Sequence, residues 1–262
     1  MVGAGRIGRL SPLIPATIAA AWVVAIVAQA TGTGRVLHHD ALIEGGLPLW
    51  AALVLFAAAW QAMIAAMMLP SSLPLVRLFA TVAAANDAGR AGRAVAALLL
   101  GYGLVWTAFG MVAFLGDLVL HHLVDTTPWL AQHSWLIAGG TLTLAGAFQF
   151  SKLKDACLSK CRLPGMFLLQ HYRRGIAAAF SLGRRHGLFC VGCCWALMLL
   201  MFAAGFANLW WMAALTALMV YEKAGAHGKR LVPFAGALLL LWGTLTIAHP
   251  LWLPAPLGGT SY

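Results

Sequence analysis

Residues 187–206 read GLFCVGCCWALMLLMFAAGF, a stretch of twenty residues without a charged side chain. A segment of about this length crosses a bilayer as one helix, which satisfies its backbone hydrogen bonds internally. The same stretch carries three cysteines and two methionines. It therefore indicates a membrane fold and raises the question of whether its sulfur atoms bind a ligand or fill space.

The composition extends this conclusion to the whole chain. Of 262 residues, 62% are hydrophobic and 9% are charged, whereas soluble domains carry about a quarter charged residues. The mean hydropathy is +0.86. The net charge of +10 is not gathered in a basic domain with interleaved aromatic residues, which argues against a nucleic-acid partner. We expect an integral membrane protein whose main surroundings are the lipid bilayer.

Seven windows are apolar enough to span. They lie at roughly 12–30, 49–69, 94–116, 134–151, 187–206, 209–222 and 231–249. We predict an all-α polytopic transmembrane helical bundle of about seven spans, forming one domain over residues 1–262. Two interrupted segments, PSSLPLVRLFATVAAANDAGR from Pro70 and HYRRGIAAAFSLGRRHG from His171, are expected to be amphipathic helices at the interface. The first window is also compatible with a cleaved signal peptide.

The basic residues predict an orientation. With the N-terminus in the cytoplasm, sixteen of the seventeen lysines and arginines fall on the inner side, and Arg35 is the exception. This asymmetry is what the positive-inside rule produces. The C-terminus is then outside, and all five cysteines lie at or near the inner face.

The cysteines occur at helical spacings. Cys157 and Cys161 are four residues apart, so that on a helix they share a face about 6 Å apart. Another stripe of sulfur climbs roughly 16 Å at the helical rise. It consists of Cys190, Cys194, Met198 and Met201, with Cys193 beside it.

A second set of sulfur residues precedes Pro70. Met63 and Met67 share a helical face, and Met68 is adjacent. Thiolates and thioethers are soft ligands that favour Cu(I), and thiolates also bind zinc. Methionine alone is weaker support because it also packs cores. The sequence therefore predicts a soft-metal site, most simply for Cu(I), with zinc as the alternative.

The cysteines are also compatible with roles that involve no metal. Structural disulfides are rare on a reducing cytoplasmic face. The CVGC motif fits a thiol redox relay, and buried cysteines also occur as inert packing residues. On the outer side, the pairs His38–His39 and His121–His122 are either a second metal site or solvated histidines. Asn208 is expected to cap a helix, Glu222 to pair with an arginine or face the thiols, and His171 and His186 to be additional ligands or bystanders.

Three motifs resemble a known family. They are WQAMIAAMMLP (60–70), FQFSKLKDACLSKCRLP (148–164) and HGLFCVGCCWALMLLMFAAGFANLWWMAALTALMVYEK (186–223). Over about residues 50–249 the chain resembles the bacterial family of predicted metal-binding integral membrane proteins, domain of unknown function 2182. The resemblance implies a copper-handling role and points to the ten sulfur residues above together with Glu222.

These observations predict a function. We expect a bacterial inner-membrane protein that transports or delivers copper through an inner-leaflet site of cysteines and methionines, with a membrane metalloenzyme or a periplasmic metal carrier as partner. The alternatives are a membrane thiol-disulfide oxidoreductase and a non-catalytic assembly subunit. The chain carries no GxxxxGK[ST] loop for nucleotide binding, and no catalytic residue is assigned. A metal-handling protein is therefore favoured over an enzyme.

Overall fold

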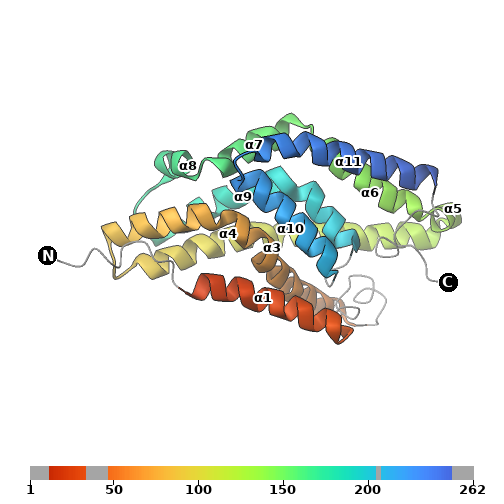
Figure 1. The fold of residues 1–262 in the computed structure, drawn as a ribbon. Coiled ribbons are helices and arrows are strands. Elements are labelled where there is room, and N and C mark those ends of the chain that lie inside the picture. Colours follow the sequence, from red (N-terminus) through yellow and green to blue (C-terminus); the bar gives the residue numbers. More distant parts are fainter. Residues whose placement is uncertain (1–11, 34–46, 205–207, 250–262) are drawn as a thin grey trace.

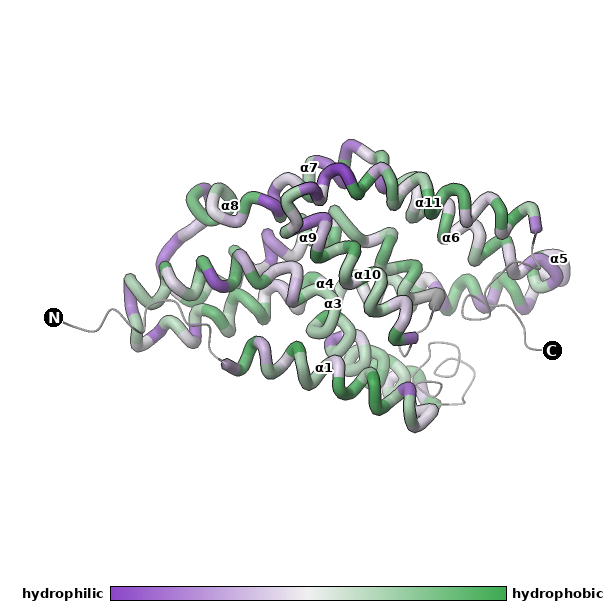
Figure 2. Tube along the Cα trace, in the orientation of Figure 1, coloured by the Kyte–Doolittle hydropathy of each residue, from purple (hydrophilic) through white to green (hydrophobic). Residues whose placement is uncertain are grey.

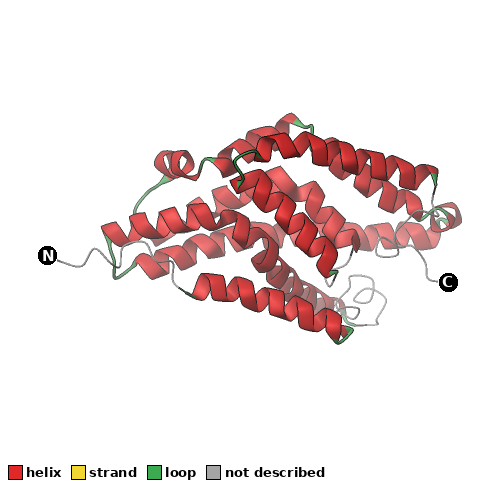
Figure 3. Ribbon diagram, in the orientation of Figure 1, coloured by secondary structure: helices red, strands yellow, loops and turns green. Residues whose placement is uncertain are grey.

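The computed structural model describes residues 12–33, 47–204 and 208–249, and no strand occurs in these ranges (Figures 1 and 3). Helices make up nearly all of this part of the chain. In order they are α1 (Leu13–Ala30), α3 (Leu49–Asn86), α4 (Ala91–Thr126), α5 (Pro128–Gln132), α6 (Trp135–Phe148), α7 (Lys152–Arg162), α8 (Pro164–His171), α9 (Ile176–Ala204), α10 (Leu209–Ala224) and α11 (Gly228–Ala248). The predicted all-α fold is confirmed.

Within the part of the chain that the structure describes, four helices are long and apolar enough to cross a membrane, namely α1, α3, α4 and α11. Figure 2 shows hydrophobic residues along these helices and hydrophilic residues at helix ends and on α7. Each predicted window overlaps a helix, but α6 has only 14 residues and α10 only 16. The expectation of about seven spans and its orientation therefore stay predictions.

The expected break after Pro70 is wrong. Helix α3 continues through Pro70 and Pro74 for a total of 38 residues. Proline removes a backbone donor and disfavours a helix interior, but neighbouring side chains can satisfy the freed groups in membrane helices. The N–H that Pro70 lacks would bond to the Ala66 carbonyl oxygen, and here the Trp22 indole of α1 donates to that oxygen over 3.1 Å. The segment after Pro70 is thus a continuation of α3, and it carries Ser71 and Ser72 into the bundle.

The segment from His171 is also not a separate interfacial helix. Helix α8 ends at His171, a short connection follows, and α9 then runs without interruption from Ile176 to Ala204. The short helices outside the long ones are instead α7 and α8, which lie along one edge of the bundle (Figure 1).

Glycines bring α4 and α9 into close contact. Side chains added at Gly101 or Gly183 would collide with backbone atoms of Phe180 and Leu98 on the opposite helix. Small residues at such positions let membrane helices approach closely and pack by van der Waals contact. Helices α6 and α11 use the same device at Gly146 and Gly236. The α4 contact fixes α9, the helix that carries three of the five cysteines.

The main core lies where α3, α4, α9 and α10 meet. Its largest buried side chains include Phe56, Trp60, Trp106 and Phe114. The Trp60 indole donates to the Trp106 carbonyl oxygen over 2.8 Å, which ties α3 to α4. The sulfur residues belong to this same core, so the fold places the predicted ligands in one buried region.

Candidate metal centre

The structure brings the ten predicted sulfur residues together. Nine are buried, and the tenth, Cys161, is partly exposed and packs against the same core. They come from α3 (Met63, Met67, Met68), α7 (Cys157, Cys161) and α9 (Cys190, Cys193, Cys194, Met198, Met201). All five cysteines are free thiols. The shared core makes contact between the sulfur groups possible, although it does not by itself make them ligands.

Cys190 is at the centre of the polar contacts in this core. Its sulfur lies 3.1 Å from the Lys223 ammonium nitrogen and 3.1 Å from the Tyr102 hydroxyl. The lysine is a donor only, and Tyr102 can donate because Ser72 donates to it over 3.2 Å. The Cys190 sulfur then accepts two hydrogen bonds, one from each of these groups.

A chain of hydrogen bonds leads to Tyr102. The His186 Nε2 atom lies 3.2 Å from the Ser72 hydroxyl, which donates to Tyr102. Because Ser72 has one proton to give, His186 is assigned as the donor to Ser72. His186 is thus occupied as a buried hydrogen-bond partner, and Ser72 and Tyr102 stand between it and the Cys190 thiol.

Lys223 also connects the thiols to the proline region of α3. Its ammonium group donates to the Ser71 hydroxyl over 3.0 Å and lies 3.9 Å from the Cys194 sulfur. A buried ammonium is costly unless it is paired and hydrogen-bonded. The two sulfurs and the serine supply these partners, so Lys223 is an integral part of the thiol site.

The other two cysteines of α9 point to different neighbours. The thiols of Cys193 and Cys194 both donate to the Cys190 carbonyl oxygen, over 3.1 and 2.9 Å. The Cys194 sulfur also lies 3.8 Å from the Met68 sulfur. Cys194 and Met68 therefore form a thiol and thioether pair that joins α9 to α3.

Helix α7 contributes the remaining two thiols. The Cys157 sulfur packs directly over Gly192 of α9, where any side chain would collide with it. Burial and the neighbouring Cys193 raise the pKa of the Cys157 thiol. Hydrogen bonding to Cys193, together with burial, raises the pKa of the Cys161 thiol well above its usual value.

A buried ion pair holds α7 in place. The Lys154 ammonium lies 2.7 Å from a Glu222 carboxylate oxygen, and both side chains are buried. The Arg162 guanidinium donates to the backbone carbonyl oxygens of Glu222 and Gly225 at the end of α10. The expected arginine partner of the Glu222 carboxylate is therefore a lysine instead. These contacts position the two cysteines of α7 against α9.

The structure also limits the kind of site that is present. Within the described residues, no three histidine, cysteine, aspartate or glutamate side chains surround a common point. On the outer side, His121 bonds to the Asp117 carbonyl oxygen over 3.0 Å and pairs with its carboxylate. His38 and His39 lie outside the described residues. His171 stacks on Phe167 and bonds to its carbonyl oxygen.

Sequence reasoning missed several members of the site. Tyr102, Ser71 and Ser72 contact the thiols or their partners, and Met212 and Met219 of α10 lie in the same core. The signal for Tyr102 is a single hydroxyl in the apolar run LLLGYGLVW. The two α10 methionines are seven residues apart and therefore share a helical face. Asn208, in contrast, caps α10 as predicted, since its side chain accepts from the Trp211 N–H.

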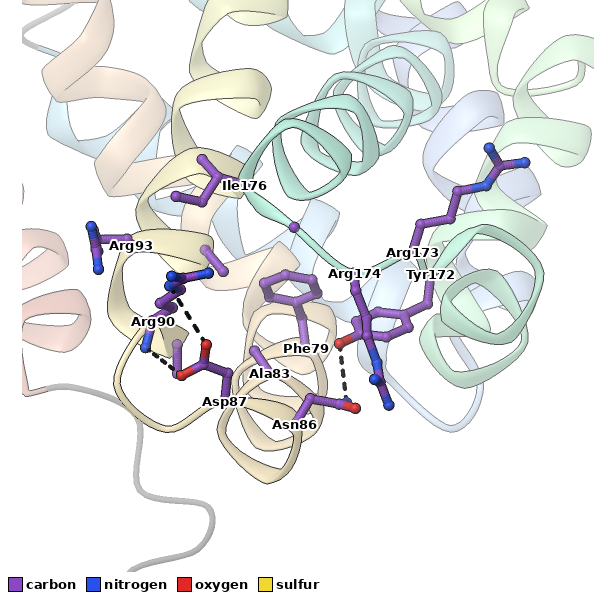
Figure 4. Close-up of a pocket in the computed structure, with 13 residues that line it drawn as sticks. Phe79, Ala83, Asn86, Asp87, Arg90, Arg93, Tyr172, Arg173, Arg174 and Ile176 are labelled. Atoms are coloured by element: carbon purple, nitrogen blue, oxygen red, sulfur yellow. Dashed lines mark hydrogen bonds and ion pairs between the residues drawn. The ribbon is translucent and has the colours of Figure 1, made fainter.

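A separate cavity of about 600 Å³ lies where the α3–α4 turn meets the α8–α9 connection (Figure 4). Phe79 and Ala83 form its buried part, and four exposed arginines surround it: Arg90, Arg93, Arg173 and Arg174. Arg90 pairs with Asp87, while Arg93 and Arg173 point away from Phe79. The arginines thus do not converge on one point, and no sulfur residue lines this cavity.

The donor atoms of the buried core fit copper as a cargo. Soft thiolates and thioethers select Cu(I), whereas structural zinc takes four nitrogen or sulfur ligands in a tetrahedron. The core offers Cys190 and Cys194, both within 3.9 Å of the Lys223 ammonium nitrogen, and Met68, whose sulfur lies 3.8 Å from that of Cys194. Such a set suits an ion that accepts few sulfur ligands.

Comparison with known proteins agrees with this chemistry. No curated protein and no solved structure matches the chain. A family model described as PpoB2, copper chaperone, matches residues 57–246. This range is most of the chain and contains all ten predicted sulfur residues as well as Lys223. The chain therefore belongs to this family of copper chaperones.

Proposed function

We propose that the protein is a membrane-embedded Cu(I) carrier of the cytoplasmic membrane that holds copper between Cys190, Cys194 and Met68 and delivers it to a metalloprotein. The partner would be a membrane metalloenzyme under assembly or a periplasmic metal carrier. The family supports a role with copper. The choice of copper ligands and the delivery to a partner are inferred from the geometry of the thiols.

One observation carries the proposal. The Cys190 sulfur accepts hydrogen bonds from Lys223 and Tyr102, while Cys194, one turn later on α9, lies 3.8 Å from the Met68 sulfur. The Lys223 ammonium, which lies within 3.9 Å of both thiols, can balance the charge that they carry when they bind copper. The neighbouring thioether adds a third soft donor at the same place.

The charges favour Cu(I) over a divalent ion. Two thiolates and Cu(I) carry one net negative charge, which the adjacent Lys223 ammonium neutralises. Two thiolates and Zn²⁺ are already neutral, so the ammonium would leave an uncompensated positive charge in the apolar core. The surroundings of Cys190 and Cys194 therefore suit a monovalent soft cation.

The mode of action follows from the burial of the site. A bare cation in the apolar core would be very costly, and the sequence has no GxxxxGK[ST] loop that would couple its movement to a nucleotide. Copper would then move by exchange from one sulfur to the next. Met63, Met67, Met198 and Met201, buried in the same core, would supply weaker thioether ligands along the way.

The test is an anaerobic Cu(I) titration of the protein in lipid nanodiscs, with metal content measured by mass spectrometry. X-ray absorption at the copper edge then identifies the ligand atoms. We expect about one tightly bound Cu(I) per chain with sulfur ligands only. The double variant Cys190→Ser/Cys194→Ser should lose it, and Met68→Leu should weaken it. Met166→Leu is the matched control, because this methionine of α8 is exposed and lies outside the core.

Two outcomes would contradict the proposal. Full copper binding by the double serine variant would exclude this thiol pair as the site. A wild-type protein that takes up no Cu(I), but forms a reversible disulfide between its cysteines, would favour the membrane thiol-disulfide oxidoreductase instead.

A further inference from the structure

The cavity beside the α3–α4 turn lies at the end of the bundle where α4 and α9 begin (Figure 4). These two helices run parallel, because a side chain at Gly183 would meet Leu98, while one at Gly187, a turn later, would meet Val105. The first residue of each helix lines the cavity. The N-termini of two long helices therefore open on the same space of about 600 Å³.

The backbone gives this space a positive potential. The first N–H groups of a helix have no partner within the helix, and its dipole is positive at that end. The first turns of α4 and α9 contain no acidic residue that would offset this charge. Gly175, which precedes α9 with a φ of +104°, has nothing within 4 Å of a Cβ position. The start of α9 is thus open to a ligand.

The side chains add further positive charge. Four arginines line the cavity, and among the described residues that line it Asp87 is the one acid, which leaves a net charge of +3 (four less one). Asp87 is already paired, since its carboxylate accepts the Arg90 N–H over 3.1 Å and lies 3.7 Å from the Arg90 Nε atom. The cavity therefore favours an anion, and the planar guanidinium group matches phosphate well.

The floor of the cavity is apolar and held in place. Phe79 and Ala83 are buried there as part of the second hydrophobic core. The Tyr172 ring packs 6.0 Å from the Phe79 ring, and the Asn86 side chain donates to the Tyr172 hydroxyl over 3.2 Å. An apolar floor beneath a basic rim suits a ligand that is itself amphipathic.

The direction of the arginines favours a lipid over a soluble phosphate compound. A small anion is held best by side chains that converge on it, whereas Arg93 points away from Phe79 (Figure 4). Arg93 instead begins a stripe of exposed residues at helical spacing along α4, which is long and apolar enough to cross a membrane. The stripe consists of Arg93, Ala96, Leu100 and Leu104. On a membrane helix such a stripe faces the lipid tails.

We infer that this cavity binds an anionic phospholipid, with the phosphate held by Arg93 and Arg174 and the acyl chains lying along the exposed stripe of α4. Basic pockets between membrane helices are a known way of binding anionic headgroups. The inference goes beyond the proposed function and does not depend on copper. A lipid bound here would tie together the starts of α4 and α9, the helices that carry Tyr102 and Cys190.

The test is native mass spectrometry of the full chain, released from detergent micelles after titration with phosphatidylglycerol or with phosphatidylcholine of the same acyl chains. We expect the first phosphatidylglycerol to bind at least about tenfold more tightly than phosphatidylcholine, a difference of about 1.4 kcal/mol. In Arg93→Gln/Arg174→Gln this preference should fall to about twofold or less.

The matched control is Lys160→Gln/Arg230→Gln. It removes the same charge from exposed positions on α7 and α11 that do not line the cavity, so the lipid preference should stay at the wild-type value. Ala94→Trp is a second test, because it fills the cavity from α4 without changing any charge. It should abolish the preference as well, and thermal unfolding of each variant establishes that the bundle remains folded.

Three results would overturn the inference. The first is equal affinity of the wild type for the two lipids. The second is an equal loss of preference in the control variant, which would make the effect one of overall charge. The third is full displacement of the lipid by an excess of glycerol phosphate, which would identify a soluble phosphate compound as the ligand. None of these measurements involves copper, so each leaves the proposed function standing.

Discussion

Lys223 is the residue that most distinguishes this thiol site from a simple cluster of cysteines. Its ammonium contacts Cys190, Cys194 and Ser71 in the buried core. If it neutralises the charge of the copper-bound thiolates, Lys223→Met should lower the affinity for Cu(I) at least about tenfold, or about 1.4 kcal/mol. Competition with a chelator of known affinity measures this change.

The control for this prediction is Lys229→Met. Lys229 also lies near the end of the bundle that carries α7, but it is largely exposed and pairs with Asp155 at the surface over 3.7 Å. Exposed ion pairs contribute little, so copper affinity should stay at the wild-type value. An unchanged affinity in Lys223→Met would show that the lysine has only a structural role.

The sequence predicts which thiols share a helix face better than it predicts the residues that surround them. Helical spacing correctly places Cys190 and Cys194 on one face, because i and i+4 positions coincide on any helix. It does not reveal that Cys157 packs on Gly192 or that Tyr102 reaches Cys190, since both contacts join helices far apart in the sequence. Such contacts depend on helix packing, which periodicity alone does not determine.

Among the elements, the contact between α4 and α9 has the clearest mutational consequence. A methyl group at Gly101 would collide with the backbone of Phe180, and backbone atoms cannot move aside as a flexible side chain can. Overpacking of this kind costs about 1–3 kcal/mol. We expect Gly101→Ala to lower the free energy of unfolding by this amount, measured by equilibrium denaturation in mixed micelles.

Gly116→Ala provides the control on the same helix. Nothing lies within 4 Å of a Cβ at this position, so the substitution should change stability by no more than about 0.5 kcal/mol. If both variants unfold alike, the close approach of α4 and α9 is not a source of stability.

The buried ion pair that attaches α7 to α10 predicts a second change in stability. Lys154→Met leaves the Glu222 carboxylate buried without its cation, and breaking a buried pair in this way costs about 3–5 kcal/mol. The double variant Lys154→Met/Glu222→Gln removes the charge as well and should be more stable than the single variant. Denaturation of the two side by side measures the difference, and a double variant that is less stable than the single one would contradict this account.

The two errors in predicting elements have a common physical cause. Pro70 and the charged run near Arg184 are helix-ending or interfacial signals in a sequence read by local composition. In the structure both segments continue long helices, α3 and α9, because the Trp22 indole bonds to the Ala66 carbonyl oxygen that Pro70 leaves free and the glycines of α9 pack on α4. Tertiary contacts therefore overrule the local signals at both places.

For the molecule as a whole, its orientation in the membrane decides from which side copper could reach the thiols. The charge asymmetry of the sequence predicts that the α3–α4 turn and the α8–α9 connection face the cytoplasm, and that the α4–α5 connection faces outward. The cysteines of α7 would then meet a cytoplasmic metal carrier, and a route from there through the methionines would lead outward.

Reporter fusions measure this orientation directly. Green fluorescent protein fluoresces when it is fused on the cytoplasmic side, and alkaline phosphatase is active only after export. We expect fluorescence from fusions after Asp87 and Tyr172 and phosphatase activity from a fusion after Thr127, because α4 separates the first two sides and the predicted span at 134–151 would return the chain to the cytoplasm. Exchanging the two reporters at each site should reverse every signal. Phosphatase activity after Tyr172 would instead place the α8–α9 connection and the cysteines of α7 on the outer side, so that the protein would exchange copper with a carrier there.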